Sequence, residues 1–123
     1  MLEGVALSLL DCKNYLDGLS IPHKGSATLI GGGAKGKLWR KITSDALGIT
    51  LQTVENSDSS LGSAMLAGIA SGVFADPADA LRRCLRVTGE VVPDPSATER
   101  YAAVFERYKR VHDALAPLYG DRL

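Results

Sequence analysis

Three consecutive glycines, Gly31–Gly33, constrain this chain more than any other feature, because the segments on either side have different hydrophobic periods. The run 27–30 before them is apolar without alternation, which predicts a strand buried on both faces, as in a parallel sheet. After Lys35, apolar residues recur at every fourth position, which predicts a helix that ends at Gly48. A strand, a glycine turn and a helix in this order indicate an α/β protein.

The glycine turn also has the chemistry of a phosphate site. Glycines permit positive φ and close approach of a ligand, and the unpaired N–H groups at a helix start attract anions. Positive charge is added nearby by Lys35, Lys37, Arg40 and Lys41. A bulky β-branched residue at Gly32 or Gly33 should therefore abolish binding, by blocking the phosphate and by demanding φ > 0. The alternative interpretation is a tight βα turn followed by a solvated basic helix.

Helical patterns dominate the rest of the chain. Helices are predicted at about 2–17, after Asp58 or Ser59, after Asp76-Pro77, and from a capping box with Ser96 as N-cap and Glu99 as its partner. Residues 49–54 alternate and predict a second strand nearer a sheet edge, and 86–92 predict a weak strand or an extended loop. The predicted order is α-β-α-β-α-α-α, a helix-rich α/β arrangement with a very small sheet.

Composition and charge narrow the possible functions. The chain has 123 residues, which is room for one domain, with 46% apolar and 23% charged residues, as in ordinary globular proteins. Its 14 basic and 14 acidic residues cancel, so charge gives no case for binding nucleic acid or an anionic membrane. Apolar runs are too short to span a bilayer and the start lacks a secretory signal, so we expect a cytoplasmic protein.

Several conspicuous side chains are expected to be structural. Cys12 and Cys84 have no CxxC or Cys/His companions, which favours two buried thiols over a disulfide or a metal site. Trp39 is expected to pack between helices, and His112 to lie in the interior beside an apolar stripe. Leu38 could flank a purine or belong to the core.

Two general phosphate-binding motifs compete for the glycine turn. Gly31, Gly33 and Gly36 satisfy GxGxxG, and Glu55 follows the next strand, where a dinucleotide-binding fold keeps its ribose-binding acid. The stretch from Gly31 to Lys37 also fits the beginning of a P-loop, but Leu38 stands where a Ser or Thr must hold magnesium. The P-loop interpretation therefore fails, and the dinucleotide interpretation stays open.

A family resemblance extends over nearly the whole chain. Its blocks are Glu3–Ala6, then Gly31–Ala34 with Leu38–Arg40, then Ser60–Ala64 and Leu66–Gly68, and a tail with Tyr101, Tyr108-Lys109, His112 and Ala114 to Tyr119. In this order and spacing, the chain resembles the carboxy-terminal domain of FGGY carbohydrate kinases, with the greatest likeness to xylulokinase-type members. The resemblance implies part of an actin-like (ribonuclease H-like) ATPase domain, a helix-rich α/β fold whose small parallel sheet lacks its first strands. Residues 1–123 would then be a single partial domain.

The same resemblance implies a chemistry and a site. FGGY kinases transfer the γ-phosphoryl group of ATP to a sugar hydroxyl with magnesium. In this chain the implied nucleotide-binding residues are Gly31, Gly32, Gly33, Ala34 and Lys37. The catalytic aspartate, the sugar-binding residues and the acids near Mg²⁺ lie upstream in the family, so no residue here is predicted to be catalytic or to bind metal. ATP or ADP is the expected partner, and a sugar only in the full-length enzyme.

The resemblance also raises a question of assembly. Without the first strands of the domain, the strand at 27–30 would keep an unpaired edge, and apolar helix faces would stay uncovered. We therefore expect self-association, most simply as a symmetric dimer. A non-catalytic interaction scaffold is the remaining alternative function.

Overall fold

The computed structural model describes residues 1–21, 25–55 and 58–120. Its elements are α1 (Leu2–Gly18), β1 (Ser26–Leu29), the 3-10 turn η1 (Gly32–Lys35), α2 (Lys37–Leu47), β2 (Thr50–Val54), α3 (Ser59–Ala70), α4 (Pro77–Cys84), β3 (Val87–Val91) and α5 (Pro95–Gly120). The helices and strands predicted from the sequence are confirmed within a few residues. No helix in the described ranges is both long and apolar enough to cross a membrane.

The three strands form one mixed sheet in the order β1-β2-β3. β1 runs parallel to β2, with Ala27 opposite Leu51, whereas β3 runs antiparallel to β2, with Gln52 opposite Glu90. The expectation of a parallel sheet is therefore wrong for β3. β2 is the central strand rather than one near an edge, because the weak segment 86–92 forms β3 on its other side.

The predicted burial of the first strand on both faces is also wrong. Three of the four β1 residues are exposed, and only Leu29 is half-buried. Among the described residues β1 has a paired strand on one side only, so its apolar side chains have little to pack against there. Leu51 and Val54 of the central β2 are buried instead.

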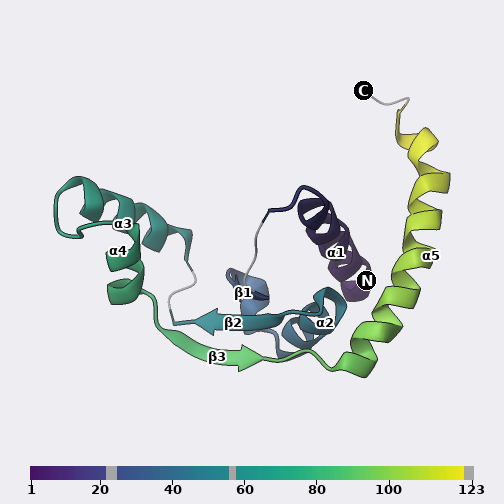
Figure 1. Cartoon of the computed structure of the whole chain (residues 1–123), viewed down its shortest axis with the longest axis horizontal. Coiled ribbons are helices and arrows are strands. Elements are labelled where there is room, and N and C mark those ends of the chain that lie inside the picture. Colours follow the sequence, from purple (N-terminus) through teal and green to yellow (C-terminus); the bar gives the residue numbers. More distant parts are fainter. Residues whose placement is uncertain (22–24, 56–57, 121–123) are drawn as a thin grey trace.

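The core lies where α1, α2 and α5 pack together (Figure 1). Leu7 and Leu10 of α1 meet Phe105 of α5, and Leu47, Tyr101 and Tyr108 pack against this cluster. α3 and α4 pack on each other and form an arm at the opposite end of the molecule from α5 (Figure 1). Phe74 lies so close to Gly68 that a side chain there would collide with its ring, and Arg83 covers the same ring at 4.8 Å.

Local signals place most of the helix ends. The carboxylates of Asp58 and Asp76 accept hydrogen bonds from Ser60 N–H and Asp79 N–H at the starts of α3 and α4. Gly48 ends α2 in the left-handed conformation, with φ 64°.

The capping box predicted at Ser96 is wrong. α5 begins at Pro95, which takes the first helical position, so the cap is Asp94, two residues before the predicted one, and its carboxylate accepts the Ser96 N–H.

Three expectations about single side chains are corrected. Cys12 is exposed and Cys84 half-buried, although both thiols are free as predicted. His112 on α5 is exposed, and its Nδ1 lies 3.3 Å from Asp113 Oδ1. Leu38 is 66% exposed on α2, so it is not part of the core.

Candidate functional site

The glycine turn is a strained corner followed by one turn of 3-10 helix. Gly31 has a φ of 82° and a ψ of −175°, which only glycine adopts readily. Its carbonyl oxygen accepts the Ala34 N–H at 3.1 Å, and the Gly33 carbonyl accepts the Gly36 N–H at 3.1 Å. The N–H groups of Gly32 and Gly33 open this turn, where no preceding helical carbonyl lies in reach.

The three glycines differ in what their surroundings demand of them. Only Gly31 has positive φ, so the expectation of φ > 0 at Gly32 or Gly33 is wrong. A Cβ at Gly33 would lie 2.9 Å from Trp39 Nε1, because the indole packs over that residue. A Cβ at Gly32 would meet no atom within 4 Å. At Gly32, therefore, neither a positive φ nor a nearby atom of this chain explains why the residue is a glycine.

An apolar recess of about 340 Å³ opens beside the turn. Leu2 and Val5 of α1 form one wall, and Gly32, Gly33, Gly36 and Trp39 form the other. Leu2 and Val5 are each about half exposed, so the wall is accessible to a ligand. An apolar surface beside open backbone N–H groups suits a ligand that carries both a flat ring and an anionic group.

The cations predicted near the turn have separate roles. Lys35 lies in η1 and Lys37 is the first residue of α2; both are exposed, and neither lines the recess. Lys41 lies one turn further along, where its Nζ contacts Asp45 at 2.8 Å and the Val92 carbonyl oxygen at 3.3 Å. Lys35 and Lys37 are therefore better placed than Lys41 to meet an anion at the turn.

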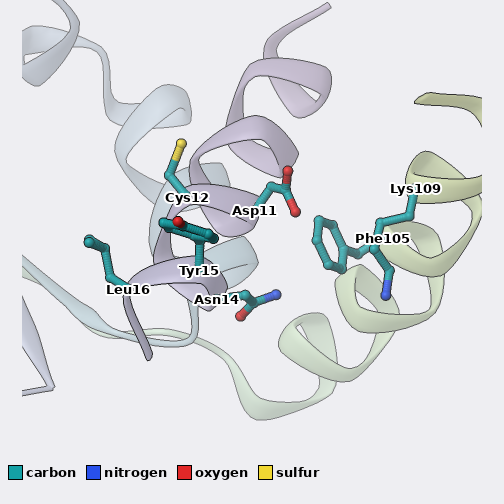
Figure 2. Close-up of a pocket in the computed structure, with 7 residues that line it drawn as sticks. All are labelled: Asp11, Cys12, Asn14, Tyr15, Leu16, Phe105 and Lys109. Atoms are coloured by element: carbon teal, nitrogen blue, oxygen red, sulfur yellow. The ribbon is translucent and has the colours of Figure 1, made fainter. Parts of the chain in front are cut away.

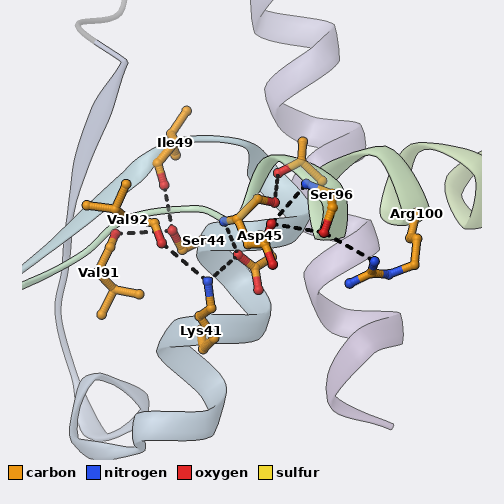
Figure 3. Close-up of polar contacts among 10 residues, drawn as sticks. Lys41, Ser44, Asp45, Ile49, Val91, Val92, Ser96 and Arg100 are labelled. Atoms are coloured by element: carbon orange, nitrogen blue, oxygen red, sulfur yellow. Dashed lines mark hydrogen bonds and ion pairs between the residues drawn. The ribbon is translucent and has the colours of Figure 1, made fainter.

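A buried polar network holds the far end of α2 (Figure 3). Asp45, whose side chain is 8% exposed, accepts the Asp94 N–H at 2.7 Å as well as Lys41 Nζ. Ser44 Oγ lies 2.9 Å from the Ile49 carbonyl oxygen and 3.1 Å from that of Val91. These contacts tie α2 to β3 and to the start of α5, so they fix the helix that follows the glycine turn.

A second cleft, of about 620 Å³, lies between α1 and α5 (Figure 2). Its lining is mainly apolar, with Tyr15, Leu16 and Phe105. Lys109 stands 5.3 Å from the Phe105 ring and forms an ion pair with Glu106 at 2.9 Å. The cleft has no convergent set of catalytic groups, so the glycine turn remains the better candidate site.

The described residues contain no group of three or more His, Cys, Asp or Glu side chains that could hold a metal ion. Asp79 and Asp94, the carboxylates with altered acidity, both act in helix caps. Hydrogen bonds from Ala75 N–H and the neighbouring arginines lower the pKa of Asp79, and those from the Ser96 hydroxyl and N–H lower the pKa of Asp94. The cause is local capping in both cases, not a catalytic arrangement.

Known proteins with similar sequences and structures were compared with the chain. No family model matches it. The autoinducer-2 kinase of Escherichia coli K12 is 33% identical over 91 residues, which are 73% of this chain and 17% of that protein.

Among solved structures, xylulose kinase from Rhodospirillum rubrum is 26% identical with a TM-score of 0.77, covering 97% of this chain and 24% of that one. Gluconate kinase from Lactobacillus acidophilus shares the fold, with a TM-score of 0.85 at 22% identity, over 98% of this chain and 24% of that one.

These likenesses agree on one class of protein. The chain belongs to the FGGY family of carbohydrate kinases, and its fold matches part of the actin-like domain of these enzymes. It spans about a quarter or less of the length of the relatives it matches.

The dinucleotide-binding alternative is not supported by the topology. After β2 the chain continues into α3 and α4 and then an antiparallel strand, whereas a dinucleotide-binding fold continues with parallel βαβ units. Glu55 is exposed after β2, with its N–H donating to the Arg86 carbonyl oxygen. Two parts of the site were not predicted from the sequence, the packing of Trp39 on Gly33 and the recess wall on α1. Both join residues that no single periodicity connects.

Proposed function

We propose that this chain is the nucleotide-binding portion of an ATP-dependent carbohydrate kinase, and that Gly31, Gly32, Gly33, Ala34 and Lys37 contact the nucleotide. The observation that carries the proposal is the open side of the glycine turn at Gly32, next to the apolar recess. Gly31 is equally open, but its positive φ already accounts for a glycine there, whereas Gly32 has neither a positive φ nor an atom within 4 Å of a Cβ position.

The residues of the site suit an ATP or ADP molecule. The N–H groups of Gly32 and Gly33 supply donors for phosphate oxygens, at the positive end of a helical turn. The recess between Val5 and Trp39 offers apolar surface to the base or the ribose. Lys37 adds an ammonium group at the start of α2, where it can meet a phosphate oxygen without forming part of the recess.

We assign the base and the metal that the reaction needs to other parts of a full-length kinase. Phosphoryl transfer needs charge stabilisation and a base on both sides of the phosphate. The described residues do not fit a Mg²⁺ site, so we assign the metal to the parts of a full-length kinase that this chain does not match. The chain alone should therefore have no sugar kinase activity. Xylulose or a similar sugar is the proposed acceptor of the full-length enzyme. Because ATP is an intracellular substrate, we place that enzyme in the cytoplasm.

Thermal unfolding with ATP, ADP or NAD tests the proposal. A ligand that binds only the folded chain raises its melting temperature. We expect ATP and ADP to raise it and NAD to leave it unchanged. A shift with NAD alone would favour the dinucleotide interpretation, and no shift with any of the three would favour a non-catalytic scaffold.

Gly32→Val locates the site. A Cβ at position 32 meets no atom of the chain within 4 Å, and the backbone there has no positive φ. The variant should therefore fold normally while its side chain blocks the phosphate. Gly62→Val is the matched control, because Gly62 is equally open and lies on α3, which packs against α4 rather than against the turn. We expect Gly32→Val to lose the ADP shift and Gly62→Val to keep it. An undiminished ADP shift in Gly32→Val would show that the phosphate lies elsewhere.

A further inference from the structure

Trp39 is the single tryptophan of the chain, and it lines the recess beside the glycine turn. It lies in the first turn of α2 and is half-buried. Two atoms of its five-membered ring, Nε1 and Cδ1, lie 2.9 and 3.1 Å from the position that a Cβ at Gly33 would take. The nitrogen-bearing edge of the indole therefore faces the glycine turn, and the absence of a side chain at Gly33 is what lets it come so close.

The N–H group of this indole is an unused donor. An indole nitrogen can only donate a hydrogen bond, and in a fold it usually has an acceptor when it is buried. Among the described residues, Trp39 Nε1 has no acceptor. The buried side-chain atoms without a partner are Arg40 Nε and Thr43 Oγ1 instead, so the indole nitrogen is unpaired at the surface rather than in the interior.

The position of this donor indicates which part of a ligand it meets. The N–H groups of Gly32 and Gly33 open the turn, and Nε1 lies beside Gly33, at the same end of the recess. A phosphate oxygen that reaches these backbone donors comes close to the indole edge as well. A hydrogen bond to such a charged oxygen is stronger than one to a neutral acceptor.

We propose that Trp39 is a specificity-determining residue of the nucleotide site, and that its Nε1–H donates a hydrogen bond to a phosphate oxygen of the bound nucleotide. The inference rests on the proposed function, because it takes ATP or ADP as the ligand. It adds a side-chain donor to a turn that otherwise offers backbone N–H groups. The added donor favours a phosphorylated nucleotide over the nucleoside alone.

Nuclear magnetic resonance of the whole chain tests the donor directly. Because the chain has one tryptophan, its indole N–H gives a single resonance in a nitrogen–proton correlation spectrum. A hydrogen bond to a phosphate oxygen moves an N–H proton downfield. We expect ADP to move the indole resonance downfield together with the amide resonances of Gly32 and Gly33. Adenosine, which has no phosphate, should leave the indole resonance in place.

The possible results distinguish this inference from the proposed function. Glycine amides that move with ADP while the indole resonance stays would overturn the role of Trp39 and leave the nucleotide site intact. An equal downfield movement with adenosine would overturn the phosphate contact and indicate the ribose or the base. A chain in which ADP moves none of these resonances would refute the proposed function, and the role of Trp39 with it.

Trp39→Phe gives a second readout, because it keeps a flat ring over Gly33 and removes the donor. We expect its dissociation constant for ADP to rise about tenfold, as for a lost hydrogen bond to a charged group. Tyr15→Phe is the matched control, since it removes a polar atom from an exposed aromatic ring of α1 outside the recess. It should bind ADP like the parent chain. Circular dichroism shows that each variant is folded. Parent-like ADP affinity in a folded Trp39→Phe would overturn the inference.

Discussion

The two ends of α2 differ in how their polar groups are used. At its beginning, the glycine turn keeps Gly32 open and presents backbone N–H groups to the outside. At its end, Ser44 and Asp45 are buried, and their side chains are bonded to β3, to the start of α5 and to the loop before β2 (Figure 3). One end is available to a ligand, and the other has its hydrogen bonds already made.

This difference explains why a site made mainly of backbone can be stable. A turn of glycines has little side-chain packing to hold it, and ordering it costs conformational entropy. α2 is held instead at its far end by the network of Ser44 and Asp45, and at its near end by Trp39 against Gly33. We infer that the network sets the position of the turn while leaving its donors free.

Asp45→Ala should have the largest effect on this arrangement. It leaves the Asp94 N–H and the Lys41 ammonium without their shared acceptor, and an unsatisfied buried donor costs about 1–3 kcal/mol. We expect the free energy of unfolding to fall by about 2–3 kcal/mol in chemical denaturation. Asp45→Asn keeps an acceptor oxygen and should lose less. A loss of less than about 0.5 kcal/mol in the free energy of unfolding of Asp45→Ala is typical of an ordinary surface site. It would contradict the claim that the network at the end of α2 holds this helix.

Gly33→Val should have the next largest effect on the free energy of unfolding. Compared with Gly32→Val, it distinguishes a glycine needed for packing from one that leaves room for a ligand. The new side chain must displace the Trp39 indole, which lies 2.9 Å from the Cβ position, and overpacking typically costs about 1–3 kcal/mol. Gly32→Val should leave stability nearly unchanged. Equal stability losses in the two variants, measured by denaturant unfolding, would mean that the turn is not open at Gly32.

The smallest expected effect concerns the cap of α5. Hydrogen bonds from the Ser96 hydroxyl and N–H lower the pKa of Asp94 below its ordinary value of 3.8. A lowered pKa in the folded state adds stability above pH 3.8, and this stability is lost as the pH falls through the folded value. Melting temperatures of the parent and Asp94→Asn should therefore differ slightly at pH 6 and converge below the folded pKa. A difference that did not shrink as the pH fell below 3.8 would contradict the assignment.

In α5, the apolar stripe that includes Tyr101 and Phe105 shows what helical periodicity predicts correctly and what it does not. Their helical spacing predicted an apolar stripe, and both residues pack in the core as expected. The same stripe continues through Val111 and Leu115, yet these residues are largely exposed, because α5 extends beyond α1 and α2 (Figure 1). Periodicity identifies the apolar side of a helix, but it does not say how much of that side has a neighbour.

The sequence by itself determined the elements, the glycine turn and the family, because hydrophobic period, cap residues and glycine are local properties of the chain. The tertiary structure decided which strand is central, that β3 is antiparallel, and that a positive φ requires glycine at Gly31 whereas the Trp39 ring requires it at Gly33. It also showed that α1 is apolar on both sides with only one of them buried. These features depend on what lies across space from each residue: Trp39 over Gly33, β3 beside β2, and, among the described residues, little cover over Leu2, Val5 and Leu9 of α1.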